Sequence, residues 1–133
     1  MNRIIGIGFC GLVNSNHRMP GWFQRSWAYH GDDGKLFIQS GSGKTPSADF
    51  GDSGMFGQGD VVGVGLDMKS GQGFCTRNGK RLDMGDAFET LHKKFNFGKL
   101  YPCVGFSLEG LGVGLHFRVN FDGSKDHPFK FEE

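Results

Sequence analysis

Apolar and polar residues along this chain follow the spacing of short β-strands rather than that of helices. The segment Val113–Phe121 gives the clearest pattern, because every second residue from Leu115 to Phe121 is apolar and the residues between them include His116, Arg118 and Asn120. A period of two places the apolar side chains on one face. The pattern therefore predicts a strand that is buried on one side only.

Seven further segments have the β-branched and aromatic content of strands and are bounded by turn residues. Their ranges are Arg3–Cys10, Ser26–His30, Lys35–Gln39, Asp60–Asp67, Gly73–Arg77, Lys80–Leu82 and Tyr101–Leu108. Two tight turns, Gly31–Gly34 (GDDG) and Asn78-Gly79, predict hairpins between neighbouring strands. Within Asp83–Gly98, one or two helical turns are expected near residues 86–93.

Many short strands, long loops and almost no helix predict an all-β fold, an antiparallel β-sandwich. The chain shows no internal repeat and no composition break, so residues 1–133 are expected to form a single domain. The 24 scattered glycines favour turns and bulges over helix. Aromatic residues make up 14% of the chain, and their large rings allow a modest core to form.

Charge and cysteine content narrow the function classes. The formal net charge is +1 and the charges are interspersed, which argues against nucleic acid as the main partner. Cys10, Cys75 and Cys103 lie far apart in the sequence, a pattern that argues against a disulfide framework and fits a reducing compartment. No apolar run approaches the ~18 residues of a membrane span, and no signal peptide is recognised at the N-terminus.

The sequence SGSGKT at Ser40–Thr45 superficially resembles a phosphate-binding loop. That loop needs a glycine at position 38, where this chain has Ile38, and a helix directly after it, where Pro46 follows Thr45. A plain connecting loop is therefore predicted, with no nucleotide.

Other chemistry-bearing residues lack the spacing that a catalytic or metal site would need. Asp49-Phe50-Gly51 copies one kinase triplet, but the other kinase motifs are missing. The five histidines and three cysteines show neither HExxH nor CxxC, so no metal or cofactor is predicted. Asp32 and Asp33 are expected to stabilise their turn by capping backbone amides.

The loop Met19–Phe23 (MPGWF) has two interpretations. It is either a lid folded over the sandwich or a recognition surface, because an aromatic residue in a rigid loop is a typical anchor for a peptide. Trp27 alternates within a predicted strand and is assigned to the core, whereas Trp22 is assigned to the loop.

Seven motifs, in order, resemble the SPRY domain. They are IIGIGFC (Ile4–Cys10), MPGW (Met19–Trp22), SWAYHGDDGKLF (Ser26–Phe37), GDVVGVGLD (Gly59–Asp67), FCTRNGKRL (Phe74–Leu82), LYPCVGF (Leu100–Phe106) and VNFD (Val119–Asp122). The YHGDDG and PGW stretches are most similar to the subgroup of the Ran-binding protein of the microtubule-organising centre. SPRY effectors secreted by plant-parasitic nematodes belong to the same subgroup.

This resemblance implies a bent β-sandwich that works as a non-catalytic protein-binding module, an adaptor or effector. It implies a pocket for a peptide or partner-protein surface, built by loops at one end. Matched onto this chain, the partner-binding residues are Phe9, Cys10, Met19, Pro20, Gly21, Trp22, Tyr29, Ser107, Leu108, Glu109 and Gly110. The implied location is the cytoplasm, or that of a host cell after secretion. The alternative function is a carbohydrate-binding, lectin-like sandwich.

The chain departs from the family pattern at its N-terminus. A SPRY domain usually has several strands before the IGIG strand, and this sequence starts almost at Ile4. Either the chain is an N-terminally incomplete fragment or variant, or its sheets have open edges. Open edges invite pairing with another chain, so self-association is expected as a second mode of interaction.

Overall fold

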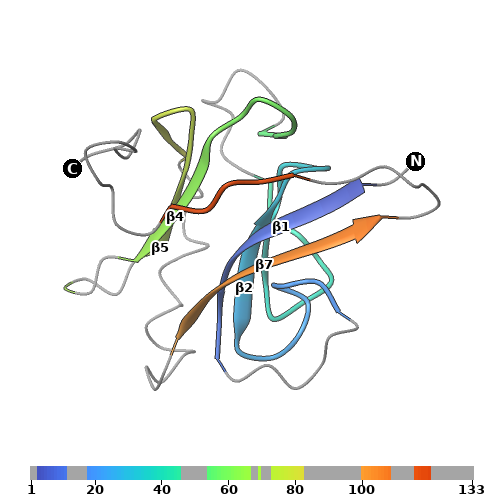
Figure 1. Cartoon of the computed structure of the whole chain (residues 1–133). Coiled ribbons are helices and arrows are strands. Elements are labelled where there is room, and N and C mark those ends of the chain that lie inside the picture. The colour runs from blue at the N-terminus through green and yellow to red at the C-terminus, as the bar shows by residue number, and fades with distance from the viewer. Residues whose placement is uncertain are drawn as a thin grey trace.

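The computed structural model describes residues 3–11, 18–45, 54–66, 69, 73–82, 100–108 and 116–120. In these residues the regular elements are seven strands, arranged in two antiparallel sheets (Figure 1). The predicted all-β, two-sheet fold is confirmed.

The larger sheet has four strands in the order β3-β2-β1-β7. Its bounds are β1 Arg3–Cys10, β2 Ser26–His30, β3 Leu36–Ile38 and β7 Tyr101–Leu108. β1 lies between β2 and β7 and pairs antiparallel with both, so residues from both halves of the chain meet on it. Figure 1 shows β7 alongside β1 over their whole lengths.

The smaller sheet consists of β4 (Val62–Leu66), β5 (Gly73–Arg77) and β6 (Lys80–Leu82), in that order. The turn between β5 and β6 is the Asn78-Gly79 pair, with φ angles of 52° and 83°. Two successive positive φ angles match the twist of a two-residue hairpin, so the predicted turn is confirmed.

The two sheets bury a shared core between their inner faces. It contains Trp27, Tyr29 and Leu36 from the larger sheet and Cys75 and Leu82 from the smaller one. Alternation along β2 sends Trp27 and Tyr29 inward, and both are completely buried. The other face of the larger sheet, which we call its outer face, carries the alternate residues of each strand.

The first hairpin and the loop after it also behave as predicted. In the GDDG turn, the Lys35 amide donates a hydrogen bond to Asp33 Oδ1 at 2.9 Å, which confirms the capping role of this carboxylate. The SGSGKT loop folds back on β3, where Leu36 and Lys44 exchange two backbone hydrogen bonds of 3.0 and 2.8 Å. This pairing makes the loop a connector.

Two expected elements have a different outcome. The predicted strand Val113–Phe121 is wrong in its described part, because residues 116–120 join no ladder and all five are exposed. Alternation sets which residues share a face, but a strand also needs a neighbour with an open edge in register. Phe117 instead contacts the ring of Phe106, with centroids 6.2 Å apart. The expected helical turns at 86–93 lie outside the described residues.

Trp27 gives a direct test of the core. We expect Trp27→Ala to lower the free energy of unfolding by ~3 kcal/mol or more, because it leaves a cavity beneath the Phe9 ring, which lies 5.2 Å away. Chemical denaturation would measure the change, with Val61→Ala as an exposed control expected to shift stability by at most ~0.5 kcal/mol. A Trp27→Ala variant as stable as the control would contradict this core.

Candidate functional site

The outer face of the four-stranded sheet is covered by residues 18–25, which we call the Trp22 loop. The loop lies close to the sheet because Gly6 and Gly105, which are register partners on β1 and β7, have no side chains. A Cβ atom at Gly6 would lie 2.9 Å from the His30 ring, and one at Gly105 would collide with the Pro20 ring. The glycines thus leave room for Met19 and Pro20 above the sheet.

Two side chains of β2 fasten the Trp22 loop. The Pro20 carbonyl can only accept, so the 2.8 Å contact shows His30 Nε2–H donating to it. Ser26 Oγ accepts from the Gly21 amide at 2.9 Å and donates to the Phe23 carbonyl at 2.6 Å. Ser26 and His30 are both buried, so these bonds form away from competing water and hold the loop rigidly.

Trp22 is the partly exposed aromatic residue that this clamped loop presents. Its ring centroid lies 5.6 Å from that of His30 and 6.0 Å from that of Phe37, so one side of the ring packs on β2 and β3. Its indole Nε1–H is shielded from solvent and has no hydrogen-bond acceptor in the part of the chain that the structure describes. A buried donor without an acceptor costs free energy that a new acceptor would recover.

His30 is held in its neutral form. Burial lowers the pKa of His30 below the ordinary value, and this effect outweighs the opposing influence of the Pro20 carbonyl, Asp32 and Asp33. The neutral ring keeps its proton on Nε2 for the bond to Pro20. His30 also stacks against Phe37, with ring centroids 4.3 Å apart.

The loop residues predicted from sequence divide into two groups. Met19 is only 7% exposed, and Pro20 and Gly21 are buried, so these three residues form a lid on the outer face. Trp22 is only partly buried and stands at the surface of that lid. The lid interpretation therefore describes residues 19–21, and the recognition-surface interpretation of Trp22 stays a prediction.

Of three other residues of the expected pocket, Tyr29 and Cys10 are buried and Phe9 is half-buried. Tyr29 points to the core, where its hydroxyl donates to the Gly54 carbonyl, and Phe9 packs against the buried core cluster. Cys10 lies on the outer face but is buried in contact with Cys103, whose thiol pKa is raised chiefly by burial. Phe9 and Tyr29 thus contribute to the sandwich core rather than to an open pocket.

The structure also separates the two strand ends that were expected to meet. Cys10 pairs with Tyr101, whereas Ser107 pairs with Ile4. Six residues of strand, or about 20 Å, separate these positions. Ser107 instead follows Gly105 on the outer face, the face that the Trp22 loop covers. Leu108 ends β7 beyond it, and Glu109 and Gly110 lie outside the described residues.

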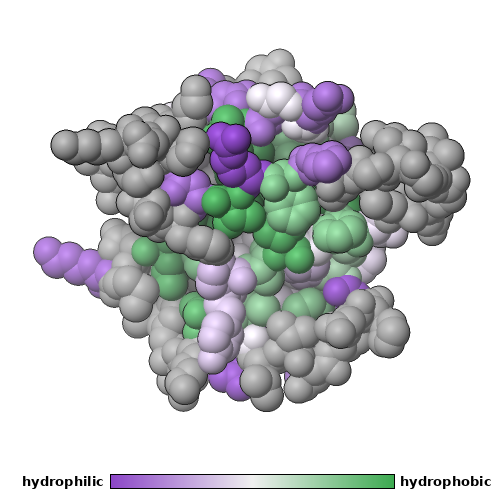
Figure 2. All heavy atoms as spheres, viewed as in Figure 1, coloured by the Kyte–Doolittle hydropathy of each residue, from purple (hydrophilic) through white to green (hydrophobic). Residues whose placement is uncertain are grey.

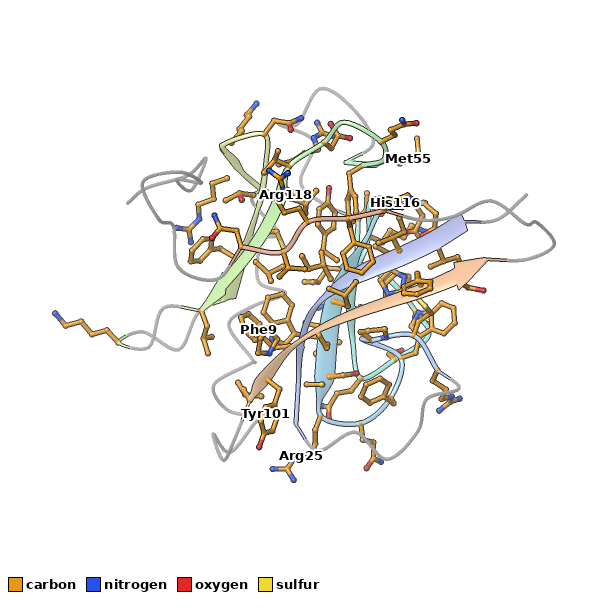
Figure 3. The ribbon with its side chains drawn as sticks, viewed as in Figure 1. Phe9, Arg25, Met55, Tyr101, His116 and Arg118 are labelled. Carbon is orange, nitrogen blue, oxygen red and sulfur yellow. The ribbon has the colours of Figure 1, made fainter. Side chains whose placement is uncertain are left out.

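The opposite end of the sheet presents other residues. Tyr101 is exposed, and Figure 3 shows it at the same end of the sheet as Phe9 and Arg25. Arg25 ends the Trp22 loop, where its amide donates to Gln39 Oε1 at 2.7 Å. Neither Tyr101 nor Arg25 was among the expected site residues.

Sequence reasoning also missed the clamp made by Ser26 and His30. The alternation in SWAYH was sufficient to place both on the face opposite Trp27 and Tyr29. What no local pattern revealed was the loop that folds back onto that face.

Two kinds of feature are absent from the described residues. No group of three or more His, Cys, Asp or Glu side chains in these parts of the chain is placed to hold a metal ion. No helix among the described segments is long and apolar enough to cross a membrane.

Comparison with known proteins gives the chain its relatives. A family model described as the SPRY domain matches residues 2–123. A Ran-binding proteins 9/10 homologue from Drosophila melanogaster is 36% identical over 132 residues, which is 99% of this chain and 12% of that protein. Human Ran-binding protein 9 is 35% identical over 128 residues, 96% of this chain and 15% of that protein.

Two further matches widen the comparison. The dual specificity protein kinase splA of Dictyostelium discoideum is 32% identical over 130 residues, 97% of this chain and 5% of that protein. A crystal structure of a human SPRY domain superposes with a TM-score of 0.55 and 27% identity, covering 80% of this chain and 69% of that one. The chain therefore spans only a small part of the length of its curated relatives.

The state of His30 leads to a prediction about pH. Because the pKa of His30 is lower folded than unfolded, the unfolded chain takes up the proton first as pH falls below about 6.5. We expect stability to fall as pH decreases from 7 through the folded pKa of His30, and to recover on returning to pH 7.

Chemical denaturation between pH 5 and 8 would measure this dependence. His30→Gln is the comparison, because its side-chain amide is long enough to donate to the Pro20 carbonyl in place of Nε2 but does not titrate. The wild-type chain should lose more free energy of unfolding on acidification than the variant does. Equal slopes in the two proteins would show that His30 is not held neutral in the fold.

Proposed function

The chain belongs to the SPRY domain family, and on this premise we propose that it is a non-catalytic module that binds a partner protein or peptide through the Trp22 loop. In this binding mode Trp22 is the one aromatic anchor. The loop that carries it is already ordered before the partner binds. A preformed anchor avoids part of the entropy cost of association.

The observation that supports this proposal is that Trp22 is partly exposed on a fixed loop. The loop around it is fixed by His30 and Ser26, while the ring itself is only partly covered. Partly exposed tryptophans in rigid surroundings are typical binding anchors. The Nε1–H without an acceptor adds a donor that a small movement of the ring would offer to a carbonyl of the partner.

Residues around Trp22 supply a polar rim. Arg18 and Gln24 of the Trp22 loop are exposed, and so is Asp32 in the adjoining hairpin turn. An apolar centre with a polar periphery is the usual composition of a protein-binding surface. Ser107 on the same face of the sheet is a further candidate contact.

The relatives support an interaction role without fixing its partner. Two of these relatives are named for Ran binding and a third is named as a kinase, and this chain matches 5% of the kinase. The matched region is the SPRY domain in the family comparison, so we assign the chain protein interaction and no catalysis. The family match favours protein binding over the carbohydrate-binding alternative.

For the cellular role we propose a single-domain adaptor that works in the cytoplasm, where unpaired cysteines remain reduced. The finer assignment, an effector delivered into a host cell, follows only from the resemblance to the secreted nematode proteins. Self-association through an open sheet edge is a separate proposal. Among the described strands, it concerns the free edge of β7.

Trp22 provides the test of the binding site. Affinity purification with mass spectrometry would first identify a partner, and calorimetry would then measure its affinity for purified variants. We expect Trp22→Ala to weaken binding by about 2 kcal/mol or more, which is roughly 30-fold. Trp22→Phe keeps most of the ring packing but lacks the N–H, so its loss should be about tenfold.

Met55→Ala is the matched control, because Met55 is a half-exposed apolar residue outside the Trp22 loop. Thermal unfolding of each variant separates lost binding from lost folding, since the ring of Trp22 also packs on His30 and Phe37. If Trp22→Ala bound the partner as tightly as Met55→Ala did, Trp22 would not be part of the site.

A further inference from the structure

β7 has an open edge that differs from the other strand edges of the protein. Its eight residues pair with β1 on one side, and no strand lies on its other side within the described segments. The sequence YPCVGFSL contains no charged residue. A long, uncharged edge strand is a ready template for pairing with another chain.

The remaining edges are shorter or protected. β3 has three residues, and Lys44 pairs with its Leu36. β6 carries Lys80 and Arg81, and such charges discourage edge pairing. All five residues of β4 are half-buried. β7 is therefore the edge that is long, neutral and accessible at once.

Apolar side chains are exposed next to this edge. Val104 and Phe106 are opposite Ile7 and Ile5 in the register, so they lie on the inner face, yet they are 39% and 50% exposed. Phe117 and Val119 are also about half exposed, and the ring of Phe117 contacts that of Phe106. Figure 2 shows apolar atoms in the middle of the viewed face, where Figure 1 draws β7 and the segment 116–120.

We propose that the open edge of β7 pairs antiparallel with β7 of a second copy of this chain, forming a symmetric dimer with one continuous eight-stranded sheet. The exposed side chains of Val104 and Phe106 from both copies, with the Phe117 ring that contacts Phe106, then lie on the same face of that sheet. The apolar surface that each copy leaves open is covered in part by the other.

Symmetry makes a second copy a fitting occupant. A twofold axis that pairs two identical strands antiparallel is perpendicular to the sheet, so the inner faces of both copies point to the same side. Residues that face each other across an antiparallel pair share a face, so Val104 must meet an inner-face residue of the second copy. Registers that place Val104 opposite Pro102, its own counterpart or Phe106 all bring apolar side chains together.

Electrostatics do not oppose this pairing. β7 has no charged side chain, so pairing it with a second β7 brings no like charges together. The net charge of +1 per copy creates little long-range repulsion. Arg118 and His116 lie on the neighbouring segment and are exposed to solvent. Figure 3 shows both along that segment, away from the end of β7 that carries Tyr101.

The interface is small, so the dimer depends on concentration. One strand edge and a few apolar side chains cover less than the ~800 Å² per partner of a standard stable interface. We expect sedimentation velocity to show the 14.6 kDa chain at low micromolar concentration and a rising fraction of dimer toward about 500 µM. Trp22 lies over β2 and β3, across the sheet from this edge, so Trp22→Ala should leave dimerisation unchanged.

Val104→Lys is the decisive variant, because a lysine on an edge strand places two like charges in the pairing. It should weaken dimerisation at least about tenfold. Val61→Lys is the matched control, since Val61 is 45% exposed outside β7, and it should dimerise like the wild-type chain. Thermal unfolding confirms that both variants fold.

Amide hydrogen exchange on the wild-type chain tests the edge without any substitution. Amides of β7 should become protected as concentration rises, while those of β6 should not. A chain that stays monomeric at the highest concentration would overturn the proposal, and so would equal dimerisation of the two lysine variants. Protection of β7 that appears only with a different protein would show that the second copy is the wrong occupant.

Discussion

The alternation along β1 is the constraint on which both faces of the larger sheet depend. Ile5, Ile7 and Phe9 point inward, while Gly6 and Gly8 point outward. Of these, Ile7 and Phe9 pack against the core cluster that contains Trp27 of β2. The outward glycines remove side chains from the opposite face, which lets a loop approach the backbone. A register slip of one residue would turn the apolar side chains of β1 out of the core. The same slip would place them on the outer face, where the Trp22 loop lies.

Most of the fold could be predicted from sequence, but only part of the site could. Strand positions such as Ser26–His30 and the Asn78-Gly79 turn depend on local alternation and local backbone preference, so a single sequence carries them. The site depends on pairing. The family resemblance assigned Ser107 and Cys10 to one pocket, and only the β1–β7 register shows that they lie at opposite ends of the sheet. The strand expected around Phe117 failed for the same reason, since alternation does not specify a partner strand.

A lid and a recognition surface are compatible in the Trp22 loop. Burying Met19 and Pro20 against Gly6 and Gly105 fixes the backbone, and that fixed backbone leaves Trp22 in one orientation. His30 links the two roles because its Nε2 holds the loop backbone while its ring supports the tryptophan ring. A change at His30 would therefore act on the anchor without contacting the partner.

The contrast between β6 and β7 indicates that the edges of this sandwich are under different constraints. Lys80 and Arg81 place positive charge along β6, where a second strand would have to bury or repel it. β7 carries no charge, and its one proline, Pro102, lacks an N–H to donate only at the second residue of the strand, while Val104 and Phe106 expose apolar surface further along it. A monomeric sandwich gains nothing from such an edge, because exposed Phe and Val contribute little to its own core. The composition of β7 is thus explained better by a strand that pairs than by one that faces water.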